Sequence, residues 1–193
     1  VFIYTAGIIN TDGKGKFLHK YSPDEIIKVF TVNVLAMIMM TEEFVNSFFL
    51  PQKRGRIITI ASLAAFMRDF GAGMYDASKA AVISYMRTLA LELNGLNKIK
   101  GSDIRSNCIA PGMVKTSMTA HLDKQETEAE KKIREGQLSR FGQKDFSDPA
   151  RIADQVYQLL IADAHDLIVD ENGLHVSRFI ENMSEEIKDF RSW

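Results

Sequence analysis

The sequence contains few of the residues that define several large classes of protein. It has one cysteine, Cys108, four histidines, and no apolar run long enough to span a bilayer. A single cysteine excludes an intramolecular disulfide and a multi-cysteine zinc site, so we expect no metal centre and a reducing compartment such as the cytoplasm. The 24 basic and 25 acidic residues leave a net charge of -1. This balance argues against nucleic acid as the principal partner, and we expect no membrane partner.

The remaining composition is that of a globular protein. Apolar residues make up 46% of the 193 residues and charged residues 25%, which is enough apolar material for a sizeable core. We therefore expect a single domain over residues 1–193. Residues 1–4 already read as a buried strand without a polar lead-in, so we also expect the natural chain to begin earlier.

Short apolar runs alternate with helical patterns along the chain. Residues 1–4, 57–60 and 106–110 are typical of buried strands, and residues 174–176 predict a last short strand. Residues 54–56, Arg-Gly-Arg, read as a polar turn before the second strand.

Three helices are predicted between these strands. The first begins at the N-cap Ser22 and Pro23, runs through Asn33 and Met40, where a kink is compatible with the pattern, and ends before Pro51. The second covers residues 74–93 and stops at Asn94-Gly95, and the third begins at Asp148-Pro149 and reaches residue 160. Residues 116–143 are polar and predict an external flap that is helical in its middle.

Alternating strands and helices predict an α/β fold with a parallel sheet and helices on both faces. In such sheets ligands bind at the carboxyl ends of the strands. Residues 4–7, Ser62 and the pair Pro111-Gly112 each follow a predicted strand. We therefore expect these three places to meet at one site.

Tyr75 and Lys79 are four residues apart on a predicted helix, so their side chains share one face. An ammonium group beside a phenol favours the phenolate, and we expect Lys79 to lower the pKa of Tyr75 toward the range of acid/base catalysis. Such pairs are also common on solvated helix surfaces, which is the alternative interpretation of this one.

Several segments, taken together, resemble the short-chain dehydrogenase/reductase family. Residues 56–62, Arg-Ile-Ile-Thr-Ile-Ala-Ser, are similar to the strand that leads to the family's catalytic serine. Residues 75–79, Tyr-Asp-Ala-Ser-Lys, are similar to its tyrosine and lysine motif. Residues 107–116 resemble the segment that lies along the nicotinamide.

Further matches extend the resemblance over nearly the whole chain. Thr5-Ala6-Gly7 is similar to the end of the family's Asn-Asn-Ala-Gly strand, with Tyr4 and Thr5 in place of both asparagines. Asn33 falls where the family has a helix asparagine, and residues 138–142 resemble the end of its substrate flap, which here covers about residues 113–143. The resemblance implies a Rossmann-like, doubly wound sheet, present as its C-terminal part.

The resemblance also implies roles for individual residues. Tyr75 would exchange a proton with the substrate, Ser62 would hold the carbonyl oxygen, and Asn33 would anchor a water that connects Lys79 to solvent. Lys79 would also bond the nicotinamide ribose. The implied catalytic residues are Asn33, Ser62, Tyr75 and Lys79, and the implied cofactor-binding residues are Ala6, Gly7, Tyr75, Lys79, Pro111, Gly112, Val114 and Thr116.

The chain departs from the family pattern in three places. It has no glycine-rich turn for the cofactor's pyrophosphate, and we expect this turn upstream of Val1. The connection over residues 94–103 is longer than is usual, and a Val-Asp-Gly-Gly-like ending is replaced by Val176-Ser177-Arg178. The resemblance implies a homo-oligomer, a dimer or tetramer. In relatives the Val-Asp-Gly-Gly-like ending often supports the tetramer interface, so its replacement here argues against that assembly.

The leading hypothesis is an NAD- or NADP-dependent oxidoreductase that interconverts a ketone and a secondary alcohol, a small-molecule substrate. The overall likeness is to 3-oxoacyl-thioester reductases. The alternative hypothesis is a non-catalytic binding or assembly protein that keeps the fold and has lost cofactor binding. The Tyr4 and Thr5 replacements favour this alternative, whereas the intact set of Ser62, Tyr75 and Lys79 argues against it.

Overall fold

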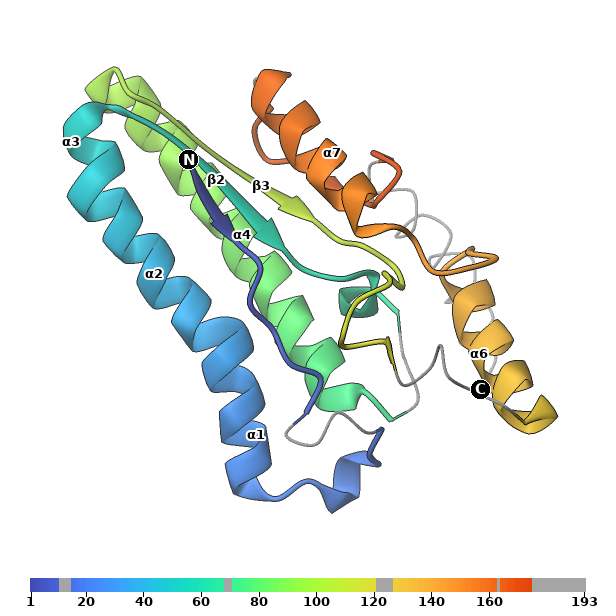
Figure 1. Ribbon diagram of the computed structural model, residues 1–193. Helices are drawn as coiled ribbons and strands as arrows, with labels where there is room; N and C mark the ends of the chain where they lie inside the picture. The colour runs from blue at the N-terminus through green and yellow to red at the C-terminus, as the bar shows by residue number, and fades with distance from the viewer. Residues whose placement is uncertain (11–14, 68–70, 121–126, 163, 175–193) are drawn as a thin grey trace, which may run out of the picture.

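The computed structural model describes residues 1–10, 15–67, 71–120, 127–162 and 164–174. One parallel sheet has the strand order β1-β2-β3-β4, in which the strands are Phe2–Tyr4, Arg54–Ile60, Asp103–Ile109 and Ile168–Val169 (Figure 1). Tyr4 pairs with Thr59, and Ile60 pairs with Ile109. The carboxyl ends of β1, β2 and β3 therefore lie at one edge. The predicted α/β fold with a parallel sheet is confirmed.

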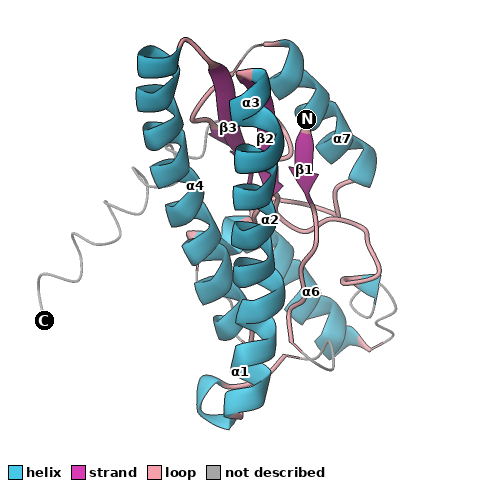
Figure 2. Ribbon diagram, turned by 90° about the vertical axis from the view of Figure 1, so that its left-hand side faces the viewer, coloured by secondary structure: helices cyan, strands magenta, loops and turns pink. Residues whose placement is uncertain are grey.

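One face of the sheet is covered by two long helical segments. The first runs through α1 (Pro23–Phe30), α2 (Ala36–Phe44) and α3 (Leu50–Gln52), and the second is α4 (Gly73–Lys100). Both lie on the same side of the strands and next to each other (Figures 1 and 2). The main core forms between these helices and alternate residues of the sheet; it includes Phe2, Met37, Ile57, Val82, Met86 and Cys108.

The opposite face of the sheet is covered by α7 (Pro149–Ile161), which begins at the N-cap Asp148 as predicted. Ile58 and Ile109 point to this side and pack with Leu159 and Val169 in a second, smaller core. Neighbouring residues of β2 thus serve opposite cores, as expected for a strand buried on both faces. Among the described residues, no helix is both long and apolar enough to cross a membrane.

The first helical segment begins as predicted and is interrupted near Asn33. Ser22 and Glu25 form a capping box, in which the Ser22 N–H donates to the Glu25 carboxylate at 2.8 Å. The break is a π-helical turn over Thr31–Leu35, and it contains Asn33. A second π-helical turn, Val45–Phe49, precedes Pro51. The prediction that the helix ends before Pro51 was wrong, because the shifted hydrogen-bond register of this turn allows α3 to continue to Gln52.

Residues 54–56 form the start of β2 and not a turn. The guanidinium of Arg56 donates to the carboxylate of Asp103 at 2.7 Å and to its carbonyl at 2.8 Å, which fastens β2 to the start of β3. Gly55 is buried beneath Phe49, and a Cβ atom on Gly55 would lie 2.3 Å from Cγ of that ring. These long-range contacts outweigh the turn-like composition of this tripeptide.

The second long helix, α4, does not stop at Asn94-Gly95 as predicted. It continues to Lys100 and ends at Gly101, whose φ of 61° is the left-handed conformation of a helix cap. The Asn97 side chain, one turn before the end, accepts from the Ile104 N–H at 3.0 Å and donates to its carbonyl at 2.7 Å. The supposed long connection is therefore mostly about two further helical turns, whose end is joined to β3.

The last part of the chain differs from the prediction in one element. The fourth strand is Ile168–Val169, paired with Cys108 and Ile109, whereas residues 174–176 were predicted as a strand. Leu174 is not in a strand, and residues 175 and 176 lie outside the described residues. The flap contains a helix, α6 (Glu128–Arg140), as expected, and residues 121–126 of the flap lie outside the described residues.

Two glycine substitutions should have opposite effects on stability. Gly55→Ala should lower the free energy of unfolding by about 2 kcal/mol or more, because the new methyl group overlaps the Phe49 ring. Gly95→Ala should raise it by about 0.5 to 1 kcal/mol, because Gly95 lies inside α4 with no atom near its missing Cβ. Urea denaturation of both variants measures these changes. A destabilised Gly95→Ala variant would contradict the continuous α4.

Candidate active site

A cavity of about 320 Å³ lies at the carboxyl edge of the sheet. Its walls include Thr5 and Gly7 after β1, Ser62 after β2, and Pro111 and Gly112 after β3. The convergence of these three places was predicted from the strand pattern and is found in the structure. The parallel register produces it, because aligned strands deliver the loops that follow them to one edge.

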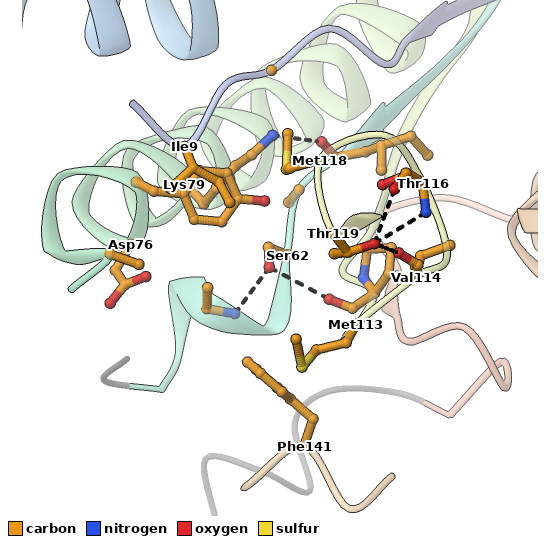
Figure 3. A pocket seen from close by; sticks show the side chains of 18 of the residues that line it. Ile9, Ser62, Asp76, Lys79, Met113, Val114, Thr116, Met118, Thr119 and Phe141 are labelled. Atoms are coloured by element: carbon orange, nitrogen blue, oxygen red, sulfur yellow. Dashed lines mark hydrogen bonds between the residues drawn. The ribbon is translucent and has the colours of Figure 1, made fainter. Parts of the chain in front are cut away.

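The first turns of α4 place Tyr75 and Lys79 on the wall of this cavity. Figure 3 labels Lys79 at this place. The Lys79 Nζ lies 5.6 Å from the centroid of the Tyr75 ring. Only 4% of Lys79 is exposed, and its Nζ donates to the carbonyl of Ile60 at 3.1 Å. The alternative interpretation of a solvated surface pair does not fit a buried ammonium group.

Burial dominates the electrostatics of this pair. Burial lowers the pKa of Lys79 to about 8, because the charged form loses its hydration. Burial also raises the pKa of Tyr75 to about 12, against the effect of a hydrogen bond with Ser62 and together with the charge of Asp76. The expected lowering of the Tyr75 pKa is therefore wrong for the protein alone, since desolvation of the phenolate exceeds any stabilisation by the ammonium.

Ser62 lies where β2 passes into a short 3-10 turn, Leu63–Ala65. Its Oγ accepts from the Ala64 N–H at 3.1 Å and donates to the Pro111 carbonyl at 3.4 Å. In Figure 3 the side chain is drawn between Lys79 above and Phe141 below. Because the bond to Pro111 is long and therefore weak, the Ser62 hydroxyl is able to donate instead to a better acceptor in the cavity.

Asn33 is fully buried and does not line the cavity. Its Oδ1 accepts from the Ile8 N–H at 2.8 Å, and its Nδ2 donates to the Ile8 carbonyl at 2.8 Å and to the Ser78 Oγ at 2.9 Å. The Tyr4 hydroxyl donates to the Val32 carbonyl at 2.8 Å, within the same π-helical turn. Tyr4 thus supports the segment that carries Asn33.

The remaining predicted residues lie at different distances from the pair. A Cβ atom on Gly7 would be 3.2 Å from the Lys79 Nζ, so the backbone passes close to the ammonium group. Val114 and Thr116 line the cavity, whereas Ala6 is exposed and does not.

Sequence reasoning missed several residues of the cavity wall. The Thr119 hydroxyl donates to the Val114 carbonyl at 2.6 Å and accepts from the Thr116 N–H at 3.1 Å, which shapes the loop after β3. Met113, Met118 and Phe141 contribute apolar surface. Their only signal in the sequence is their place at the two ends of the predicted flap, because apolar flap residues alone do not indicate which way they face.

Comparisons with known proteins agree with this geometry. Residues 1–127 match the short chain dehydrogenase family. A rabbit (Oryctolagus cuniculus) protein named dehydrogenase/reductase SDR family member 4 is 37% identical over 117 residues, which is 60% of this chain and 42% of the relative. A 3-oxoacyl-[acyl-carrier-protein] reductase of Thermotoga maritima is 31% identical over 163 residues, which is 84% of this chain and 58% of the relative. The chain thus spans about half the length of these relatives.

A solved structure shows the same fold. A putative 2-deoxy-D-gluconate 3-dehydrogenase from Agrobacterium tumefaciens with bound NADP is 27% identical, with a TM-score of 0.72 over 87% of this chain and 63% of that one. The family match covers more than half of the chain and includes Ser62, Tyr75 and Lys79. The chain therefore belongs to the short chain dehydrogenase family.

Proposed function

We propose that this chain is the catalytic part of an NAD- or NADP-dependent oxidoreductase that interconverts a ketone and a secondary alcohol. The observation that carries the proposal is the meeting of Ser62, Tyr75 and Lys79 on one cavity wall at the carboxyl edge of the sheet. The family membership supports it, since the relatives are named dehydrogenases and reductases. Because the chain spans about half of those relatives' length, we propose the activity for the whole protein.

The residues of the cavity fit a nicotinamide nucleotide. Among the described residues, the Lys79 ammonium donates only to Ile60, so donors remain for the hydroxyls of a ribose. Gly7 and Gly112 both line the cavity, so a bound ring would meet backbone and no side chain at these two positions. Val114 and Thr116 would contact its carboxamide or its phosphate side. The bound nucleotide would supply the hydride, and the chain would supply orientation and the proton.

Tyr75 is suited to give a proton to a carbonyl oxygen. Its hydroxyl is protonated at neutral pH, as a general acid in ketone reduction must be, and its pKa of about 12 lies above the near-neutral value at which a general acid is most efficient. Lys79, with a pKa of about 8, is largely cationic at neutral pH and stabilises the phenolate that remains after the transfer. In the reverse direction the same pair would accept the proton of an alcohol.

Ser62 and the flap would determine how the substrate is held. The Ser62 hydroxyl would donate to the carbonyl oxygen and stabilise the negative charge that develops there. Met113, Met118 and Phe141 give much of the surrounding wall an apolar character. We therefore propose a small molecule whose body next to the carbonyl group is largely apolar.

We also propose a homo-oligomer, a dimer or tetramer, located in the cytoplasm. Helices α2 and α4 carry exposed apolar side chains, among them Met39, 60% exposed, and Leu91, 72% exposed. Burial of such exposed apolar side chains would favour association. The only cysteine, Cys108, is buried and unpaired, which is compatible with a reducing compartment.

Tyr75→Phe should abolish turnover and leave cofactor affinity nearly unchanged, because it removes only the transferable proton. We expect kcat to fall by about 10² to 10⁴-fold in the complete polypeptide. Tyr157→Phe, on the exposed surface of α7, is the matched control and should keep full activity. A Tyr75→Phe enzyme with unchanged kcat would show that another group is the acid. A polypeptide that binds neither NAD nor NADP would favour the non-catalytic alternative.

Lys79→Met should change how stability depends on pH. Lys79 has a pKa of 10.5 in its ordinary state and about 8 when folded, so between these values the unfolded state binds more protons. Stability of the parent should therefore increase with pH across this window, by about 1 kcal/mol per pH unit relative to Lys79→Met.

Urea unfolding without nucleotide, at about pH 7.5, 8.5 and 9.5, measures this difference and stays below the window in which Tyr75 titrates. Lys98→Met, at the exposed end of α4, is the control and should follow the parent. Equal pH slopes for the parent and Lys79→Met would mean that the Lys79 ammonium is not desolvated.

Leu91→Glu should shift the oligomer toward the monomer, because it places a charge at an exposed apolar position of α4. Ile161→Glu, at the end of α7 and 58% exposed, is the control and should leave the assembly unchanged. Size-exclusion chromatography with light scattering measures both masses. A parent protein that is monomeric would contradict the proposed oligomer.

A further inference from the structure

A buried carboxylate lies directly behind the loop that follows β3. Glu171 is 3% exposed, and its Oε2 accepts from the backbone N–H of Gly112 at 2.9 Å. Its Oε1 accepts from the Gln143 Nε2 at 2.9 Å and from the Ser147 hydroxyl at 3.4 Å. In the described part of the chain all of its hydrogen-bond donors are neutral. A buried charge held by three neutral donors needs all of them in place.

Gln143 holds the next residue of the same loop. Its Oε1 accepts from the Met113 N–H at 2.8 Å, and its Nε2 lies 3.1 Å from the Met113 carbonyl. A Cβ atom on Gly112 would lie 2.7 Å from the Gln143 Oε1, so this side chain packs directly against the loop backbone. Glu171 and Gln143 thus hold two consecutive peptide groups, and we call these two residues the carboxylate-amide clamp.

The clamp is itself anchored by elements far apart in sequence. Ala110 continues the pairing of β3 with β4 by donating to the Val169 carbonyl at 2.7 Å, which brings Glu171 beside Gly112. The Asp170 carboxylate accepts from the N–H groups of Asn172 and Leu174 at 2.8 and 2.9 Å and fixes the turn that presents Glu171. The two members of the clamp therefore reach the loop from the end of the flap and from the turn after β4.

The loop held in this way is a wall of the cavity. Pro111, Gly112 and Met113 all line it, while neither Gln143 nor Glu171 does. Resting on the proposed function, we propose that Glu171 and Gln143 are positioning residues that fix the loop over residues 111–113 for the nicotinamide end of the cofactor. They act through the backbone and touch no reacting atom.

If the clamp positions the loop, variants of its two residues should lose affinity for one ligand and keep it for another, which loss of the fold would not produce. Glu171→Ala and Gln143→Ala should each weaken binding of NAD(P)H roughly tenfold, because the loop loses one or both of its backbone anchors. Binding of ADP-ribose, or of its 2′-phosphate if the protein uses NADP, should stay within about threefold of the parent, because this ligand lacks the nicotinamide. The kcat at saturating cofactor should also fall.

Two further variants separate the clamp from general damage. In Glu171→Gln the amide oxygen can still accept from Gly112, whereas the new NH2 group meets the Gln143 Nε2, which is itself a donor, so NAD(P)H binding should fall less than in Glu171→Ala. The double variant Gln143→Ala/Glu171→Ala should lose less than the product of the two single effects, because both residues hold one loop. Gln158→Ala, on the exposed face of α7, is the control and should bind like the parent.

Isothermal titration of the complete polypeptide with both ligands distinguishes the outcomes. Selective loss of NAD(P)H binding, with ADP-ribose binding kept, supports the clamp. If the parent binds NAD(P)H, the clamp is overturned when the variants lose affinity for both ligands equally or lose affinity for neither. A parent that binds neither ligand overturns the proposed function, and the clamp's role in cofactor binding with it.

Discussion

The buried amide of Asn33 is the contact on which the placement of the cavity walls depends. It makes three hydrogen bonds, two to the backbone of Ile8 and one to Ser78, and thereby joins the exit of β1 to the start of α4. Because Asn33 has no exposed surface, each lost bond would leave a buried polar group unpaired, at a cost of about 1 to 3 kcal/mol. The π-helical turn around Asn33 makes this reach possible, and it keeps Gly7 beside the Lys79 ammonium.

Burial of the polar side chains in the cavity costs free energy of folding. The same burial sets the pKa values that these side chains bring to proton transfer. Lys79 is an almost fully buried cation with one carbonyl partner in the described structure. Folding therefore removes most of its hydration, which costs free energy. The same burial brings its pKa to about 8 and keeps the Tyr75 hydroxyl protonated. A ligand that bonds to Lys79 would relieve part of this cost and would stabilise the phenolate through a fixed ammonium group.

The loop after β3 is held by hydrogen bonds from residues close to it in the sequence and by hydrogen bonds from residues far from it. Thr119 organises its continuation through bonds to Val114 and Thr116, which are neighbours along the chain. Glu171 and Gln143 come from the last turn and from the end of the flap, and they bond the peptide groups of residues 112 and 113 from outside the cavity. The flap is thus polar in composition and still contributes Gln143 to the hydrogen-bond network of the buried Glu171, which composition alone does not reveal.

Local sequence determined the features that depend on neighbouring residues. The caps at Ser22 and Asp148 fixed two helix starts, and the β-branched run 57–60 fixed the central strand. The order and spacing of the motifs around Ser62, Tyr75 and Lys79 indicated the edge at which the site forms. Only the tertiary structure decided that Gly95 continues a helix, that Gly55 lies in a strand under Phe49, and that Glu171 is buried beside Gly112. It also decided that the Tyr75 pKa rises, because desolvation, like packing, depends on groups brought together from distant parts of the chain.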